Sequence, residues 1–299
     1  MLIKLAFCRA VGSFMDKFYI ITNKSKDAEY SFTNEIMNYL KSMGKECQCQ
    51  DFEEDVMYTK YRYTNADLIP DDIECVIVLG GDGTLIQAAR DINKKNLPMF
   101  GVNLGTLGFL TATEKDTIYP ALASLIKGEY EIDSRMMLQG CVYRNDELIY
   151  KNTALNDIVI NRCGILRVID FDLYVNDEYL NSYSADGVII ATSTGSTAYS
   201  LSAGGPIVQP NAELMMITPI CPHTLNKRSI ILGADDKIVI EMSDNKGLQE
   251  ERVASFDGEL FCKMITGDKI VITRAEHKAS FIKTNKLSFL QIIREKMYN

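Results

Sequence analysis

Residues 74–84 have the sequence Glu-Cys-Val-Ile-Val-Leu-Gly-Gly-Asp-Gly-Thr, and this stretch decides the fold. The run up to Leu79 is apolar and β-branched, as is typical of a strand buried on both faces. The run leads directly into two glycines, and residues 85–92 behind them have the apolar spacing of a helix. A strand, a glycine turn and a helix in this order predict one unit of an α/β fold.

The segments on either side repeat the alternation of strand and helix. Residues 2–8 and 98–102 are short apolar runs that predict buried strands. Residues 27–43 and 116–126 carry apolar side chains at helical spacing, and a glycine that can end a helix follows each of them closely. Strands that alternate with helices predict a doubly wound, mostly parallel sheet, which we expect over residues 1–130.

The pattern changes after Gly128. Residues 131–273 have short runs of Val, Ile, Tyr and Thr, separated by residue pairs that favour turns, and they predict a second, β-rich domain. The turn pairs are Asn145-Asp146, Asn176-Asp177, Asp244-Asn245 and Asp257-Gly258. Residues 286–297 predict a terminal helix with a packed apolar face. The apolar residues of that face are Leu287, Phe289, Leu290, Ile292 and Ile293.

Composition and charge exclude several classes of protein. The chain has 299 residues, enough for about two domains at roughly 150 residues each. Its formal net charge of −8 argues against binding to nucleic acid or to an anionic membrane. No apolar run approaches the ~18 residues of a membrane span, and the N-terminus has no secretory core. The eight cysteines are scattered without a C-x-x-C motif, so we expect free thiols and a cytoplasmic protein.

The glycine turn at residues 80–84 carries the clearest chemical signal. Glycine N–H groups at the start of a helix form a pocket suited to phosphate. Asp82 is unexpected there, because its charge repels phosphate unless it binds a metal or accepts a proton from a hydroxyl group. The alternative is a tight turn in which Asp82 is only the N-cap of the helix. No Lys follows the glycines, so the turn is not a Walker loop.

Several phosphotransferases, including lipid kinases and phosphofructokinases, share this glycine motif, and four further segments narrow the choice. They are residues 101–110 (GVNLGTLGFL), 156–160 (NDIVI), 186–200 (DGVIIATSTGSTAYS) and 222–225 (PHTL). With these segments in this order, the chain resembles the ATP-dependent NAD kinase family from about residue 74 to about residue 257. The resemblance implies phosphorylation of NAD by ATP to give NADP and ADP, with Mg²⁺ carried by the triphosphate rather than by protein ligands.

The resemblance implies a catalytic role for the glycine motif. Asp82 would meet the 2′-hydroxyl of the adenosine ribose of NAD, as a general base or as the group that orients the hydroxyl. Backbone N–H groups would lie against phosphates at Gly81, Gly83 and Thr84. Phe109 would lie beside the adenine, although an aromatic residue in a glycine-rich loop can also be a plug in the core.

Other residues match the dinucleotide-binding positions of the family. Asn156 and Asp157 would bind ribose hydroxyls, with Asp in place of the more usual Glu; the alternative is a simple turn before a strand. The residues implied to line the nucleotide pocket are Thr197, Ala198 and Tyr199. Asp186 would contact the far end of the dinucleotide, in part across a subunit interface. Near Asp186, Ser184 stands where some relatives have a basic residue, for which Arg162 or Arg167 could substitute.

His223 lies in the P-H-T-L segment, where the resemblance implies a place near the triphosphate and where a structural role is equally open. The role of Asp257-Gly258 stays open, since the pair matches a family position near the nucleotide and is also an ordinary hairpin turn. The family further implies a substrate cleft between the two domains, return of residues 274–299 to the first domain, and a homodimer or homotetramer. Two rival functions are a catalytically silent NAD-binding sensor on this fold and a lipid kinase that shares the glycine motif.

Overall fold

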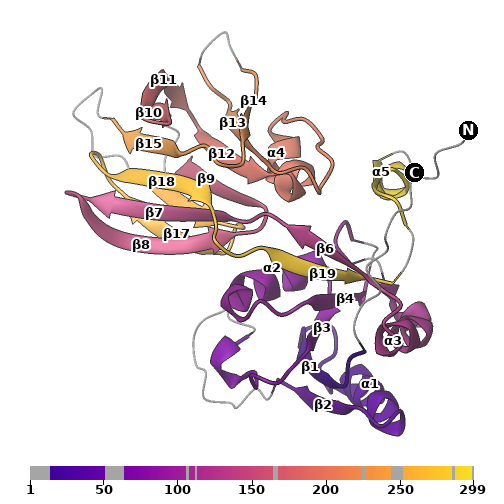
Figure 1. The fold of residues 1–299 in the computed structure, drawn as a ribbon. Coiled ribbons are helices and arrows are strands. Elements are labelled where there is room, and N and C mark those ends of the chain that lie inside the picture. Colours follow the sequence, from indigo (N-terminus) through magenta and orange to yellow (C-terminus); the bar gives the residue numbers. More distant parts are fainter. Residues whose placement is uncertain are drawn as a thin grey trace, which may run out of the picture. The chain divides into compact units, whose positions relative to one another are not determined.

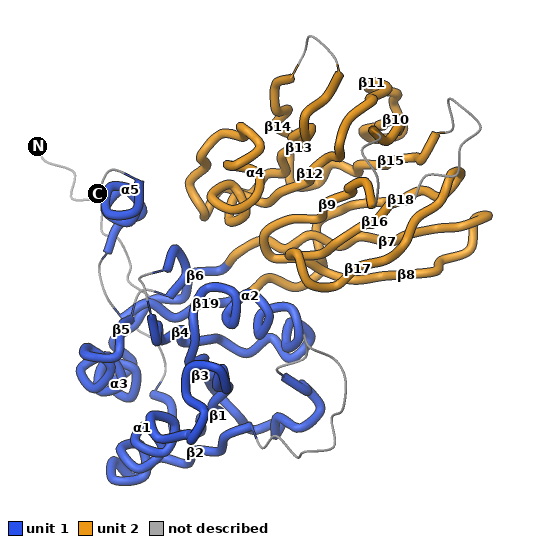
Figure 2. The backbone as a smooth tube through the Cα atoms, turned by 180° about the vertical axis from the view of Figure 1, so that it is seen from behind, with its two compact units in different colours: residues 1–134, 280–299 blue, residues 135–279 orange. Residues whose placement is uncertain are grey.

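Two compact units make up the chain in this computed structural model, residues 1–134 with 280–299 (unit 1) and residues 135–279 (unit 2), coloured separately in Figure 2. The limits expected from the sequence, near residues 130 and 273, lie a few residues earlier. The structure describes residues 14–50, 64–105, 108–111, 113–163, 168–223, 227–243, 252–284 and 287–297. Within these ranges, no helix combines the length and the apolar character that a membrane span requires.

Strands and helices alternate in unit 1, as labelled in Figure 1. In chain order, the elements are β1 (Lys17–Thr22), α1 (Ser31–Ser42), β2 (Glu46–Cys49), η1 (Ala66–Leu68), β3 (Cys75–Gly80), α2 (Asp82–Asp91), η2 (Asn93–Lys95), β4 (Met99–Asn103), β5 (Thr113–Glu114), η3 (Lys115–Thr117), α3 (Ile118–Ile126), β6 (Glu131–Arg135), β19 (Ala279–Lys283) and α5 (Phe289–Met297).

The sheet of unit 1 has the order β2-β1-β3-β4-β19-β6, with β5 also paired to β4. The pairs β1–β2, β1–β3, β3–β4, β4–β5 and β4–β19 are parallel. The chain therefore leaves β1 toward β2 and later returns to its other side as β3. In open parallel sheets, ligands bind outside the carboxyl ends of the strands at such a reversal. The loops that follow β1 and β3 meet this condition.

Helices cover both faces of this sheet. The side chains of α1 and α3 pack with Phe18, Ile77 and Phe100 on one face. Leu85 of α2 lies against Gly101 on the other face, where a methyl group built on that glycine would lie 2.8 Å from Leu85 Cδ2. The doubly wound, mostly parallel sheet is thus confirmed, and so is the return of the C-terminal segment, since β19 pairs with β4 through Phe281 and Met99.

The predicted elements near the glycine turn are confirmed with shifted ends. Helix α2 begins at Asp82 rather than at residue 85. Helix α1 begins at Ser31 because the Asp27 carboxylate accepts hydrogen bonds from the N–H groups of Phe32 (3.1 Å) and Thr33 (2.9 Å). Strand β1 was not predicted from the sequence, and the strand expected at residues 2–8 lies outside the described residues.

The predicted terminal helix forms as α5, but its apolar residues do not pack as one face. Ile292 is buried, whereas Leu290 is 74% exposed. Successive residues of a helix point about 100° apart, so Leu290 faces away from the side that Phe289 and Ile292 share. The expected packed face is therefore wrong at Leu290.

Unit 2 consists almost wholly of antiparallel strands. In chain order, its elements are β7 (Leu138–Arg144), β8 (Glu147–Ala154), β9 (Asp157–Arg162), β10 (Ile169–Val175), β11 (Glu178–Ala185), β12 (Gly187–Thr192), η4 (Thr194–Thr197), α4 (Tyr199–Ser202), β13 (Leu214–Ile220), β14 (Ile230–Gly233), β15 (Ile238–Met242), β16 (Arg252–Phe256), β17 (Leu260–Met264) and β18 (Lys269–Arg274). The β-rich second domain predicted from the sequence is confirmed.

These strands form two sheets that pack face to face. The sheet orders are β11-β10-β15-β18-β7-β8 and β14-β13-β12-β9-β16-β17. Phe171 and Ile270 from the first sheet share one apolar core with Ile158, Ile190 and Phe256 from the second. Strands β9, β12 and β13 also bury their outer face, where a second apolar cluster includes residues near α4. Burial on both faces explains their unbroken apolar sequences.

Three of the predicted turns are observed. Both turn residues have positive φ in Asn145-Asp146, Asn176-Asp177 and Asp257-Gly258. This conformation is typical of two-residue hairpins and explains the choice of Asn, Asp and Gly. The fourth pair, at residues 244–245, lies outside the described residues.

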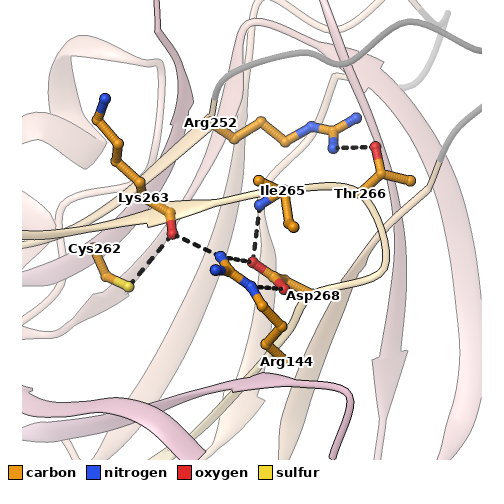
Figure 3. A network of polar contacts seen from close by, with 7 residues as sticks. All are labelled: Arg144, Arg252, Cys262, Lys263, Ile265, Thr266 and Asp268. Carbon is orange, nitrogen blue, oxygen red and sulfur yellow. Dashed lines mark hydrogen bonds and ion pairs between the residues drawn. The ribbon is translucent and has the colours of Figure 1, made fainter.

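A polar cluster joins β7 to the turn after β17 in unit 2 (Figure 3). The buried Asp268 carboxylate accepts two hydrogen bonds from Arg144, from Nε and Nη2, each at 2.9 Å. It also accepts a hydrogen bond from the Ile265 N–H at 2.8 Å. Nearby, the buried Arg252 donates to Thr266 Oγ1 and to the Ser243 carbonyl. The bonds from Arg144 and from Arg252 to Thr266 tie the turn to β7 and β16, and the Ile265 bond closes the turn itself.

We predict that Asp268→Asn lowers the free energy of unfolding by about 2 kcal/mol, because hydrogen bonds to a charged group contribute about 1.5–3 kcal/mol. The NH2 group of the asparagine would also face a hydrogen-bond donor, either Arg144 or the Ile265 N–H. Urea denaturation measures the change. Asp177→Asn is the matched control, since the exposed Asp177 only pairs with Lys237 at a hairpin turn, and we expect less than about 0.5 kcal/mol there. Equal stability of the two variants would contradict the prediction.

Candidate functional site

The glycine turn lies between the end of β3 and the first turn of α2. Gly80 has no room for a side chain, since a methyl group there would lie 2.3 Å from Thr84 Oγ1. Gly81 is the N-cap of α2, with extended backbone and no side-chain cap. Around Gly83, by contrast, no described atom lies within 4 Å of the place of a side chain. The missing side chain of Gly83 therefore leaves the helix N-terminus open to a ligand, as a phosphate site requires.

The Asp82 carboxylate holds a second loop, residues 108–111. Oδ2 accepts a hydrogen bond from the Phe109 N–H (2.6 Å). Oδ1 accepts hydrogen bonds from the N–H groups of Leu110 and Thr111 (3.1 Å each) and from Thr111 Oγ1 (3.0 Å). Gly108 is required at this contact, because a methyl group there would lie 1.8 Å from Asp82 Oδ1. The alternative in which Asp82 only caps its own helix is wrong, since the cap is Gly81.

The loop after β1 brings a positive charge to the two glycine loops. A methyl group built on Gly81 would lie 3.3 Å from Lys26 Nζ, and one built on Gly105 would lie 3.2 Å from the same atom. Asn23 fixes this loop by donating a hydrogen bond from Nδ2 to Thr84 Oγ1 at 3.0 Å. Lys26 was missed from the sequence because the strand before it, β1, was missed. A basic residue in the loop after the first parallel strand is the signal that could have found it.

Phe109 is half-buried at the end of this region. The Lys296 ammonium group of α5 lies 4.9 Å from the centroid of its ring. A ring that is half-exposed and beside a cation is not a plug in the core. Its place beside an adenine stays a prediction.

In unit 2, the turn at Leu155–Asp157 is held from two sides. The Asp257 carboxylate accepts hydrogen bonds from the N–H groups of Leu155 (2.9 Å), Asn156 (2.7 Å) and Asp157 (3.2 Å). From the other side, Thr192 donates its hydroxyl to the Leu155 carbonyl (2.6 Å) and its N–H to the Asn156 carbonyl (2.9 Å). A carboxylate a hundred residues away thus fixes the shape of the turn at the start of β9.

The carboxyl group of Asp157 has a strongly raised pKa. Its side chain is buried, and among the described residues no group donates a hydrogen bond to it. Burial, and secondarily the negative charge of Asp257, raises the pKa of Asp157 to about 7. A buried carboxyl group without a donor needs one from elsewhere, and ligand hydroxyl groups are suitable donors.

The segment after β12 lies next to this turn. Gly195 packs against it so closely that a methyl group would lie 2.1 Å from the Asn156 carbonyl oxygen. Thr197 and Ala198 are half-buried at the end of η4, and Tyr199 begins α4. The Tyr199 side chain is 41% exposed, so it is not packed in the core. Gly195 thus places the start of η4 against the turn, and Thr197, Ala198 and Tyr199 follow it within four residues.

Asp186 and His223 form a separate group at the other end of β12. Asp186 precedes the strand and pairs with Arg162 (Oδ1 to Nε, 2.8 Å). His223 is exposed, and its N–H donates to the Ser184 carbonyl at 2.8 Å. At ~3.4 Å per residue, about 20 Å of strand separates this end from Thr192. The structure therefore does not bring the two groups together within unit 2. Arg167 lies outside the described residues.

Comparisons with known proteins identify the family of the chain. Family models described as the ATP-NAD kinase N-terminal domain and C-terminal domain match residues 20–130 and 155–284. An NAD kinase of Lachnospira eligens is 56% identical over 293 residues, which cover 95% of this chain and 100% of that protein. An NAD kinase of Lachnoclostridium phytofermentans is 42% identical and covers 94% of this chain and 99% of its own length.

Solved structures show the same fold. A yeast NADH kinase complexed with NADH matches with a TM-score of 0.79 at 26% identity, over 96% of this chain and 88% of that one. An NAD kinase of Archaeoglobus fulgidus in complex with ATP matches with a TM-score of 0.69 at 24% identity, over 90% of this chain and 94% of that one, and this match bears on the fold alone. On the sequence identity and coverage of its relatives, the chain belongs to the ATP-NAD kinase family.

Proposed function

We propose that the chain transfers the γ-phosphoryl group of ATP to the 2′-hydroxyl of the adenosine ribose of NAD, giving NADP and ADP. The observation that carries the proposal is the Asp82 carboxylate, fixed at an open helix N-terminus by three N–H groups of another loop. Three of its four hydrogen bonds fall on Oδ1, so Oδ2 keeps a lone pair for a hydroxyl donor.

The proposed triphosphate site uses the first turn of α2. The hydrogen-bond donors of this site are the backbone N–H groups of Gly81, Gly83 and Thr84. The Lys26 ammonium group adds a positive charge. Such groups fit an anion. Since the sequence has no basic residue in the glycine motif itself, Lys26 is the side chain that would neutralise phosphate charge there.

Magnesium belongs to the proposed donor substrate. Among the described residues, no group of three or more His, Cys, Asp or Glu side chains could hold a metal ion. Around the glycine turn, Asp82 is a single carboxylate among hydrogen-bond donors and Lys26, so this region does not supply the set of oxygen ligands that a metal held by the protein requires. We propose that the cation arrives with the triphosphate oxygens, as Mg²⁺ does in many phosphotransferases.

For NAD, we propose that Asn156 and Asp157 bind ribose hydroxyl groups and that Tyr199, with its exposed ring, stacks near a base. Thr197 and Ala198 would line the same region, and Phe109 would lie beside the adenine. For Asp186 and His223, which lie about 20 Å away along β12, we propose a role at the far end of the dinucleotide or in the site of a neighbouring subunit.

The proposed reaction needs little from the protein beyond position and charge. Asp82 Oδ2 accepts a hydrogen bond from the 2′-hydroxyl and takes its proton as the new oxygen–phosphorus bond forms. The bond between the γ-phosphorus and the bridging oxygen breaks, and ADP leaves with that electron pair. Orientation of the hydroxyl in line with this bond supplies much of the acceleration.

We also propose a homodimer or homotetramer in the cytoplasm. Each edge strand of the two sheets in unit 2 carries an exposed apolar side chain, and exposed edges favour pairing with another chain. These side chains are Leu148 on β8, Tyr179 on β11, Ile231 on β14 and Phe261 on β17. All cysteines within the described residues are free thiols, which suits a reducing compartment.

The function is tested by incubating the purified protein with NAD, ATP and Mg²⁺ and measuring the products by mass spectrometry and ³¹P NMR. We expect NAD to gain one phosphate, on the adenosine 2′-oxygen. Bound NAD without phosphorylation would instead indicate a sensor, and phosphorylation of a lipid but not of NAD would indicate a lipid kinase.

We predict that Asp82→Asn lowers kcat by a factor of about 10²–10⁴ while the dissociation constant of NAD changes little, because the lost group acts mainly in the transition state. The variant should also melt at a lower temperature, since the amide turns an N–H toward the loop that Asp82 holds. Steady-state kinetics and a thermal melt on one preparation measure both. A folded variant with more than about a third of the wild-type kcat would remove Asp82 from the mechanism.

We predict that Lys26→Ala raises the KM for ATP about tenfold to a hundredfold and leaves the KM for NAD unchanged, since a charged hydrogen bond to phosphate is lost. Lys24→Ala is the matched control in the same loop, because the Lys24 ammonium group lies over the Tyr30 ring instead (5.9 Å from its centroid). If both variants have the same KM for ATP, Lys26 does not bind the triphosphate.

We predict that the KM for NAD rises about tenfold for each pH unit below 7, because ribose hydroxyls donate to the ionised form of Asp157, whose pKa is raised to about 7. Below this pH, binding must first remove a proton from the carboxyl group. The KM for NAD between pH 6 and pH 8 measures the effect. Asp157→Asn should abolish this dependence, and a pH profile that the substitution leaves unchanged would exclude the assignment.

A further inference from the structure

The carboxylate of Asp257 lies at the tip of the β16–β17 hairpin and points back at the backbone of residues 155–157. Its Oδ1 accepts hydrogen bonds from the N–H groups of Asn156 and Asp157, and its Oδ2 accepts a hydrogen bond from the Leu155 N–H. In addition, the Asp257 N–H donates to the Asp157 carbonyl at 3.0 Å. Four hydrogen bonds from one residue thus fix three consecutive residues of the turn.

A hairpin turn alone does not require this arrangement. Asp146 and Asp177 are the second residues of two other hairpin turns with positive φ, and each has an exposed side chain that pairs there with a half-buried lysine. Asp257 is the first residue of its turn (φ of 51°), and its carboxylate accepts three backbone N–H groups from a segment a hundred residues earlier, whereas Asn176 in the matching position accepts one, from Lys237. The difference lies in the direction and partners of the carboxylate.

The turn that Asp257 holds presents Asp157, whose buried side chain receives no hydrogen bond from any described residue. A side chain in this state depends on the backbone for its direction, because no other polar contact fixes it. Thr192 and Gly195 close the opposite side of the turn, so a shift of the backbone there has no free space.

We propose that Asp257 is a positioning residue for NAD, which acts through the backbone of Leu155–Asp157 and does not touch the dinucleotide. The inference rests on the proposed role of Asn156 and Asp157 in binding NAD. The turn between β16 and β17 would then contribute to ligand binding besides connecting the two strands.

The test compares Asp257→Asn with Asp146→Asn in the full-length protein. Asn is compatible with positive φ at both turns, so backbone strain is matched. At position 257, the asparagine side chain has one acceptor oxygen for the three backbone N–H groups of residues 155–157. Its NH2 group then faces the N–H groups that the oxygen does not reach. We expect the KM for NAD to rise about tenfold, with the KM for ATP unchanged, and no change in either KM for Asp146→Asn.

A merely structural role has a different signature. Loss of folded protein lowers the apparent kcat and leaves both KM values unchanged, and this outcome would overturn the proposal. If Asp257→Asn does not fold, Asp257→Glu replaces it, because the longer side chain keeps the charge but displaces the turn; the same rise in the KM for NAD is then expected. Wild-type protein in the same assay reports on the proposed function itself, since failure to phosphorylate NAD there concerns the function and not Asp257.

Discussion

Aspartate carboxylates hold the functional loops of both units. Each accepts hydrogen bonds from the backbone N–H groups of a distant segment of the chain. Asp82 accepts three such groups from residues 109–111, and Asp257 accepts three from residues 155–157. Asp27 accepts N–H groups of residues 32 and 33 at the start of α1, as a local counterpart. Backbone N–H groups in a loop need an acceptor, and an ionised carboxylate accepts without donating. The loops therefore have a defined shape without regular secondary structure.

This constraint explains a carboxylate in a loop built for phosphate. Three backbone dipoles and a hydroxyl group point at Asp82, and Lys26 Nζ lies beside Gly81 and Gly105 in the same region. These groups offset the negative charge of the aspartate before any ligand binds. The carboxylate can then serve as an acceptor for a hydroxyl while the open N-terminus of α2 still attracts phosphate.

Local patterns predicted much of the fold, and contacts between distant segments account for most of what was missed. The apolar run before Gly80 and the alternating runs of unit 2 predict their strands because periodicity records burial. Strand β1 was not predicted, although Phe18–Ile21 is an unbroken apolar run, and the strand expected at residues 2–8 lies outside the described residues. Lys26 and Asp257 act on residues about 55 and 100 positions away, and no local pattern records such a contact.

The central claim is that the Asp82 carboxylate both holds the loop at residues 108–111 and orients the hydroxyl to be phosphorylated. A crystal structure of the protein with NAD and a non-hydrolysable ATP analogue tests it most directly. We predict that Oδ1 keeps the N–H groups of Leu110 and Thr111 while Oδ2 lies within hydrogen-bond distance of the adenosine 2′-oxygen, with the γ-phosphorus on the far side of that oxygen. A 2′-oxygen that lies against another residue, with Asp82 bound only to its loop, would contradict the account.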